Sequence, residues 1–318
     1  MKQRLYNWEG MLFATFLVIF ALNALTLPAF LTPANQINMF QLSIEKLIVV
    51  LVMAFIIINA EIDLSVGSMM GLSACAFGWM FQQGIDPVLA IGICILIGGI
   101  GGAMNGFFVA YVGLPSLVVT LATLIGFRGL ARVLVEDRGI TDFPAWFDAL
   151  GQQGLPGQVP LSLICFAVMF LGAWVILERS GFGRKTYVIG SNRDVADFAG
   201  INTRRHKMIL FIASGSISAF AGLLYAARVG AVRGDVATGF ELDIITIVLL
   251  GGASIFGGTG TLVGTGLAIL IVLSLRNGMA LHNITGHIQT GVIGLLLIAS
   301  VIVPRLKVAR KASEWAKA

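Results

Sequence analysis

The feature that most constrains this chain is a succession of long apolar blocks that an aqueous fold could not bury. Four of them are Met11 to Phe30, Leu47 to Ile58, Leu161 to Leu177 and Val292 to Val303. A helix needs about 20 mainly apolar residues to cross the hydrocarbon of a bilayer. Only 12% of the 318 residues are charged, against roughly 25% in soluble domains. The sequence therefore predicts an all-α, polytopic membrane protein whose first block is a retained helix.

About ten transmembrane helices are predicted, within a single domain that covers residues 1–318. Their approximate bounds are 10–30, 44–59, 64–82, 87–111, 116–134, 161–177, 208–228, 243–256, 261–277 and 288–303. Several of these segments are short, and two pairs of them are separated by only a few residues. The number of helices is therefore approximate.

The basic residues predict the orientation of the chain. They gather before the first helix, in the loop 178–207 and in the tail 304–318. Loops rich in Lys and Arg stay in the cytoplasm, and ten helices would place all three regions on one side. We therefore expect cytoplasmic termini in a multi-pass protein, with 135–160 as the longest loop on the opposite side. We attribute the formal charge of +5 to these cytoplasmic basic residues, and we expect no nucleic-acid partner.

Two stretches predict broken or re-entrant helices, near 60–68 and 251–260. The first places Asp63, Ser65 and Ser68 between apolar segments. Asp63 is suited to cap the helix that follows, and the stretch fits either a short interfacial turn or a break that lines a path. Irregular backbone at membrane depth is tolerated only inside protein or beside water. We therefore take these three residues as candidates for a pathway or re-entrant site.

The second stretch begins a run of seven glycines within residues 251–266, which is poor material for a straight helix. No Gly-Lys-Ser or Gly-Lys-Thr follows it, so it is not a phosphate loop. Glycine-interrupted segments in both halves of a chain point to a central pathway in transporters. The sequence also shows no catalytic constellation, no metal-ligand spacing and no reason to expect a cofactor.

The loop 178–207 contains a predicted short helix that is suited to coupling with another protein. Ser191 or Asn192 can cap it, and Gly200 is placed to end it. An apolar face between basic stretches fits a groove on a partner; the alternative is a helix that lies on its own membrane domain. The candidate coupling residues are Ser191, Asn192, Arg193, Asp194, Val195, Ala196, Asp197, Phe198, Ala199 and Gly200.

Small residues recur every fourth position at Gly98, Gly102 and Gly106. Such stripes let membrane helices approach closely, so we interpret them as packing surfaces, with a substrate role as the alternative. Further pathway candidates follow from residue type alone, since aromatic faces, amides and guanidinium groups suit sugars. They are Trp79, Asn105, Arg228 and Arg233.

Several motifs together resemble the permease subunits of the ribose, xylose and arabinose class of bacterial ATP-binding-cassette sugar importers. The matching stretches are Ile62–Ser68, Gly102–Ala131, Ile189–Asn202, Leu249–Gly260 and Asn277–Gly278. The chain departs from the family at Ala60 and Glu61, where two glycines are usual, and at Ser116, where Phe is common. Parts of the C-terminal half, such as Arg228–Asp235, resemble permeases assigned to rhamnose.

The resemblance implies a complex in the inner membrane. A cytoplasmic ATPase subunit would hydrolyse ATP, with Phe198 in or near its groove, so the chain itself would not be an enzyme. A second permease protomer, identical or a sister chain, would complete the path, and a periplasmic sugar-binding protein would deliver the sugar. Membrane lipid would surround the assembly. Two alternatives are an ion-coupled secondary transporter that uses Glu61, Asp63 or Asp243, and a passive channel or structural subunit.

Overall fold

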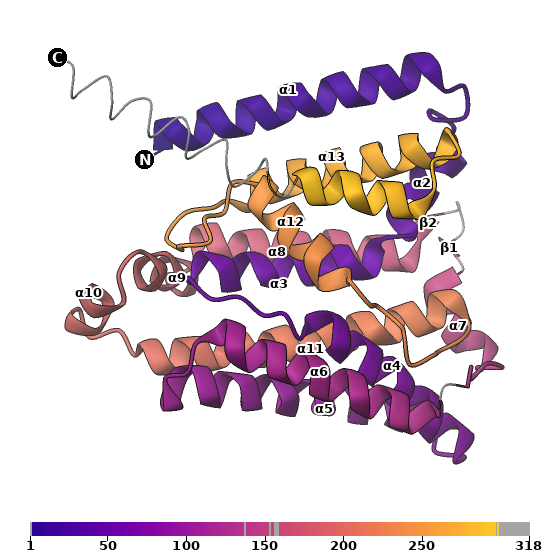
Figure 1. Cartoon of the computed structure of the whole chain (residues 1–318), viewed down its shortest axis with the longest axis horizontal. Helices are drawn as coiled ribbons and strands as arrows, with labels where there is room; N and C mark the ends of the chain where they lie inside the picture. The colour runs from indigo at the N-terminus through magenta and orange to yellow at the C-terminus, as the bar shows by residue number, and fades with distance from the viewer. Residues whose placement is uncertain (1, 137, 153, 156–158, 297, 299–318) are drawn as a thin grey trace.

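The computed structural model describes residues 2–136, 138–152, 154–155, 159–296 and 298. The predicted tail 304–318 lies outside the described residues. Most of the long helices run nearly parallel to one another (Figure 1). This is the arrangement expected when each helix satisfies its own backbone hydrogen bonds and lies across a bilayer.

Helices account for nearly all of the regular structure in the described part of the chain. They are α1 (Lys2–Thr26), α2 (Pro33–Gln41), α3 (Ile44–Ile58), α4 (Val66–Gln82), α5 (Pro87–Phe107), α6 (Ser116–Val135), α7 (Ala145–Gln152), α8 (Leu161–Arg179), α9 (Gly181–Ser191), α10 (Arg193–Phe198), α11 (Thr203–Val229), α12 (Phe240–Leu250) and α13 (Leu262–Leu281). A π-helical turn, η1 (Phe108–Val112), extends α5, and β1 (Gly154–Leu155) pairs with β2 (Val159–Pro160). Residues 286–296 are also helical.

The structure confirms a polytopic helical membrane fold but not the predicted number of spans. Among the described residues, six helices are long and apolar enough to cross a membrane, and the bent pair α2 and α3 would make a seventh. A helix lies in each predicted segment, but α12 has only 11 residues and α4 has 17. The count of ten therefore stays a prediction.

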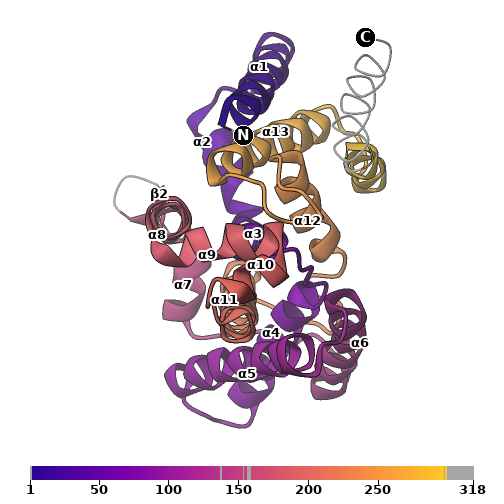
Figure 2. The same ribbon diagram turned by 90° about the vertical axis from the view of Figure 1, so that its left-hand side faces the viewer.

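The most apolar helix lies at the centre of the molecule. All 15 residues of α3 are buried. Viewed along the bundle, α3 lies between a layer that contains α1 and α13 and a layer that contains α4, α5 and α6 (Figure 2). By contrast, most of α8 is exposed, as expected for a helix that faces lipid. The apolar run from Leu47 to Ile58 in α3 thus reflects burial in protein.

The predicted packing stripe on α5 meets α11. A Cβ atom on Gly98 would contact the backbone of Gly215 and the side chain of Ala219, and one on Gly102 would contact the backbone of Phe211. Close approach of two backbones through small residues is how membrane helices associate. The structure therefore supports the packing interpretation of this stripe.

Gly102→Ala is expected to destabilise the folded chain by about 1–3 kcal/mol, the usual range for overpacking. The new methyl would meet the carbonyl of Phe211, which cannot move without shifting α11. Gly92→Ala on the same helix is the matched control, since nothing lies within 4 Å of a Cβ there. The control should be neutral or gain up to about 1 kcal/mol of helix propensity. Thermal inactivation of the detergent-solubilised chain, followed by size-exclusion chromatography, measures both; equal behaviour would contradict the prediction.

The two ends of the bundle differ. The start of α1 lies at the same end as α9 and α10, whereas α7 and the β1–β2 hairpin lie at the opposite end (Figure 1). We call these the α10 end and the α7 end. The loops 178–207 and 135–160, which the charge pattern assigned to opposite sides, therefore do lie at opposite ends.

Three short helices were not predicted. The first, α2, starts at Pro33 with Thr32 as its cap, and it bends by 54° into α3. The others, α7 and α9, lie within segments that were read as loops. In α9 the cap is Ser180, whose hydroxyl accepts from the N–H groups of Phe182 and Gly183. This is a capping signal that three glycines within the helix had obscured.

Candidate functional site

The first predicted break interrupts the path from α3 to α4. Residues 59–65 are not helical, and Ala60 adopts a left-handed φ of 63°. That conformation costs an L-residue roughly 1–2 kcal/mol, which glycine would avoid. Ala60 is one of the two positions where the chain departs from the glycines usual in the resembling family. The turn keeps its geometry without them.

Asp63 organises the break from a fully buried position. Its carboxylate accepts hydrogen bonds from the backbone N–H of Ser65 at 2.9 Å, the hydroxyl of Ser65 at 2.6 Å and the hydroxyl of Ser214 at 2.7 Å. Sequence reasoning placed Asp63 as the cap of the next helix. The helix instead begins at Val66 with Ser65 at the cap position and no side-chain cap bond. Asp63 therefore accepts hydrogen bonds from Ser65, the residue before the helix, and connects it to Ser214 on α11.

The other candidates near the break join the same network. The amide of Asn105, on α5, donates to the hydroxyl of Ser65 at 2.9 Å, and the hydroxyl of Ser68 donates to the carbonyl of Ser65 at 2.8 Å. All four residues are buried. The structure thus brings Asp63, Ser65, Ser68 and Asn105 into one cluster. Their place along a path stays a prediction, since the hydrogen bonds of these four side chains connect them mainly to one another.

Sequence reasoning missed the residues that hold the other side of the break. On α6, the hydroxyl of Ser116 accepts from the N–H of Ile62 at 3.2 Å, and the hydroxyl of Thr120 donates to the carbonyl of Ile62 at 3.3 Å. On α11, Lys207 forms a buried ion pair with Glu61. In the sequence, Lys207 is one of several basic residues before a membrane helix. Such residues indicate which side of the membrane a loop occupies, and nothing in the sequence points to Glu61 as its partner.

The second predicted break, near 251–260, lies in the non-helical stretch 251–261 between α12 and α13 and packs against the first one. Positive φ values at Gly252, Gly257, Gly258 and Gly260 show why glycine is required there. The N–H of Gly258 donates to the carbonyl of Ile58, at the end of α3, at 2.8 Å. A Cβ atom on Gly257 would contact Ala60. The two breaks, far apart in the sequence, therefore form one unit.

The predicted coupling segment also contacts this unit, through α9. The phenol of Tyr187 donates to the carbonyl of Gly260 at 2.8 Å. Burial raises the pKa of Tyr187, so the phenol stays protonated and remains a donor at physiological pH. Ser191 lies against Gly258 closely enough that only glycine fits. The chain is therefore in continuous contact from the end of α9, through the glycine-rich break, to Ile58 and Ala60.

The helix that follows α9 has the predicted caps and a largely exposed apolar face. The side chain of Asn192 accepts from the N–H of Val195 at 3.1 Å, and Gly200 takes a φ of 76° after the helix ends. Ala196 is buried, whereas Val195 is 57% exposed and Phe198 is 93% exposed. The two largest apolar side chains of α10 thus face away from the bundle.

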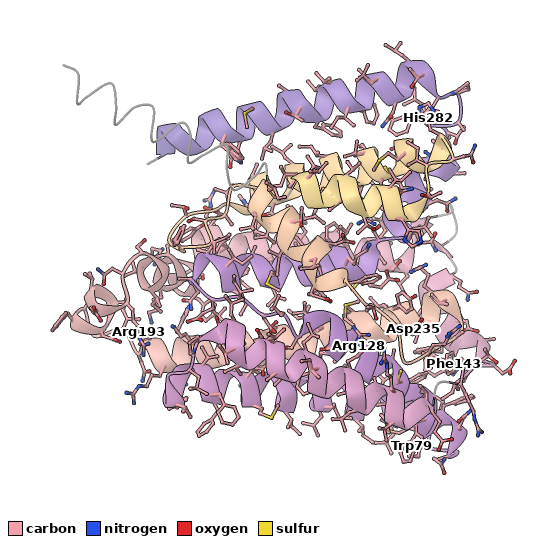
Figure 3. All side chains as sticks on the ribbon, in the orientation of Figure 1. Trp79, Arg128, Phe143, Arg193, Asp235 and His282 are labelled. Atoms are coloured by element: carbon pink, nitrogen blue, oxygen red, sulfur yellow. The ribbon has the colours of Figure 1, made fainter. Side chains whose placement is uncertain are left out.

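The remaining pathway candidates lie away from the breaks. Trp79, in the last turn of α4, is partly exposed at the α7 end (Figure 3). Arg228, in the last turn of α11, forms an ion pair with Glu45 at 2.5 Å, and the exposed Arg233 pairs with Asp235 at 3.5 Å. None of the three is joined by a hydrogen bond to the cluster around Asp63 in the described part of the chain. Their proposed contact with substrate stays a prediction.

Comparisons with known proteins found a matching family and relatives that cover most of the chain. A family model described as "Branched-chain amino acid transport system / permease component" matches residues 36–301. The chain is 34% identical to the ribose import permease protein RbsC of Bacillus subtilis over 93% of its own length and 91% of the relative. It is 33% identical to the autoinducer 2 import system permease protein LsrD of Yersinia enterocolitica, over 94% and 92%. No solved structure matches.

These matches confirm that the chain is a transport subunit rather than an enzyme, because both the family and the relatives are permease components. They cover the helices that carry both breaks and the segment α9–α10. The chain therefore belongs to the family of permease components of the branched-chain amino acid transport system type.

Proposed function

We propose that the chain is the membrane-spanning permease subunit of an ATP-binding-cassette importer that moves a monosaccharide or a similar small polyol into the cytoplasm. The observation that carries the proposal is the likeness to ribose and autoinducer 2 import permeases over more than nine-tenths of the chain. Within this class, the resemblance of Arg228–Asp235 to permeases assigned to rhamnose makes rhamnose our preferred substrate.

The energy for transport comes from partners. The chain has no Gly-Lys-Ser or Gly-Lys-Thr sequence, which a phosphate loop would need, so a cytoplasmic ATPase supplies the motor. A periplasmic binding protein delivers the sugar, and a second permease protomer, identical or a sister chain, encloses the path. On this proposal the α10 end, with the start of α1, faces the cytoplasm, as the basic residues of the loop 178–207 indicate.

The contacts at the breaks support a route for the motion. The exposed Phe198 of α10 would bind a groove on the ATPase, and displacement of α9 would be transmitted through Ser191 and Tyr187 to the glycine-rich break. That break contacts Ile58 and Ala60 at the end of α3. A shift of these packed elements as a rigid unit would move α3 against α4 and open the path at one side at a time.

Ion-coupled transport is less favoured by the geometry. Two of the three carboxylates that could carry an ion already have cationic partners. Glu61 pairs with Lys207, and Asp243 pairs with Lys46 at 3.1 Å and Arg276 at 2.6 Å. Asp63 is held by three hydrogen bonds from serines.

Reconstitution tests the proposal. In proteoliposomes that contain the chain, its ATPase partner and its binding protein, uptake of labelled rhamnose should require ATP and resist ionophores. The chain alone should not accumulate sugar under any ion gradient. Gradient-driven accumulation by the chain alone would overturn the proposal. Uptake of ribose or autoinducer 2 in place of rhamnose would correct only the substrate.

A further inference from the structure

An apolar cavity opens on the side of the bundle, and none of its lining residues belongs to either break. It measures about 490 Å³ and is lined by α3, α8 and α11, with Phe182 of α9 at the α10 end. Every lining residue is apolar or glycine. This volume is within the range of small-molecule sites, roughly 300–1,000 Å³, but such sites carry a few polar groups to orient a polar ligand. A cavity with none is suited to a hydrocarbon chain.

The cavity opens between two candidate membrane spans. Its floor is formed by the buried α3 residues Leu51, Val52 and Phe55, whereas Ile176 and Ile209 at its mouth are partly exposed. These two residues belong to α8 and α11, both of which are long and apolar enough to span the membrane. In the end-on view α8 lies beside α3 and α11 lies below it (Figure 2). The mouth therefore lies between two candidate membrane spans, near the α10 end.

Basic side chains lie at the same end of the cavity. Arg205 precedes Ile209 by one helical turn and shares its face of α11. On α9, Lys185 follows the lining residue Phe182 by three positions and so shares its face, and the ring of His206 lies 4.2 Å from that of Phe182. Lys185 and Arg205 form no ion pair with a described acidic residue. An apolar cavity with cationic groups at one end matches a lipid with an acidic headgroup.

We propose that this cavity holds an acyl chain of an anionic phospholipid from the leaflet at the α10 end, with the headgroup phosphate bound by Lys185 and Arg205. The chain reaches α3 and fills the space between α8 and α11. Since α9 closes the cavity through Phe182, the bound lipid packs directly against the segment that leads to α10.

Photolabelling tests this inference on the purified full-length chain in phosphatidylcholine nanodiscs. The probe is phosphatidylglycerol with a photoactivatable diazirine near the end of one acyl chain, added as a small fraction of the lipid. We expect labels at Met169 and Ile217, which line the cavity. Ala173→Trp, which fills it from α8, should lose these labels, and so should Ala213→Phe from α11. Leu171→Trp is the matched control, because Leu171 is 60% exposed on the same helix and does not line the cavity.

The headgroup is tested separately. Lys185→Gln combined with Arg205→Gln should lower cavity labelling by phosphatidylglycerol to the level given by a phosphatidylcholine probe. Labels spread evenly over the exposed residues of α8, with none at Met169 or Ile217, would overturn the proposal, as would equal labelling of Ala173→Trp and Leu171→Trp. Equal labelling by the two probes in the unaltered chain would overturn the anionic preference.

Discussion

Phe198→Asp is expected to lower substrate-stimulated ATP hydrolysis of the assembled transporter by about 30-fold or more. An aromatic residue that is 93% exposed at the tip of a protruding helix fits the anchor of an interface. Removing such an anchor costs at least ~2 kcal/mol, and each 1.4 kcal/mol is about tenfold in affinity. A buried carboxylate would add its own desolvation cost. The measurement is ATPase activity of the reconstituted complex with saturating substrate and binding protein.

Phe198→Leu is the matched control, since it keeps an apolar side chain of similar reach and should retain most of the activity. Both variants should fold normally, because Phe198 makes little contact with the rest of its own chain. Normal coupled hydrolysis by a folded Phe198→Asp variant would contradict the assignment of α10 to ATPase coupling. Equal losses in Phe198→Asp and Phe198→Leu would indicate that shape, rather than apolar burial, decides the contact.

Much of the helical framework could be predicted because its signals are local. Long apolar blocks require helices in lipid. The observed α6 starts at Ser116, as predicted, and α11 ends at Val229, one residue after the predicted bound of 228. The capping residues of α10 could also be predicted, since Asn192 and Gly200 act on backbone groups only a few residues away in the sequence. Local signals failed for α9, where glycines that serve close packing against Ile58 and Leu177 resemble loop residues.

The connection between the two breaks could not be predicted, because it depends on contacts between distant segments. Both stretches were identified as irregular from their own composition. Nothing in the sequence says that Gly258 bonds to Ile58 or that Ala60 lies against Gly257. Similarly, nothing in the sequence says that the hydroxyl of Ser214, on α11, donates to Asp63. A residue that is small enough for packing can also be the donor that a buried carboxylate needs.

The pathway candidates chosen by residue type show the limit of composition as a guide. Asn105 joins the cluster around Asp63, whereas Arg228 is occupied by Glu45 and Arg233 is exposed beside Asp235. A guanidinium in a membrane protein is expected to have a partner. Its presence in the sequence therefore says little about substrate until that partner is known. Position relative to the breaks is the stronger criterion for a pathway residue, and it favours the buried cluster around Asp63.

Glu61→Gln is expected to destabilise the permease by about 3–5 kcal/mol, because it leaves the ammonium of Lys207 buried without a countercharge. Both side chains are about nine-tenths buried. The pair joins the first break to the start of α11, so its loss would also loosen the turn at Ala60.

Glu136→Gln is the matched control. The pair between Glu136 and Arg138 is 3.5 Å long and highly exposed, and such pairs contribute roughly 0–1 kcal/mol. Unfolding by a denaturing detergent, monitored by circular dichroism, gives the free energies. The double variant Glu61→Gln with Lys207→Met should recover part of the loss, since replacing both charges removes the unpaired ion. If the free-energy losses of Glu61→Gln and Lys207→Met, each measured alone, add up to the loss of the double variant, the two charges are not coupled. The first break would then be held by Asp63, Ser116 and Thr120 without help from the ion pair.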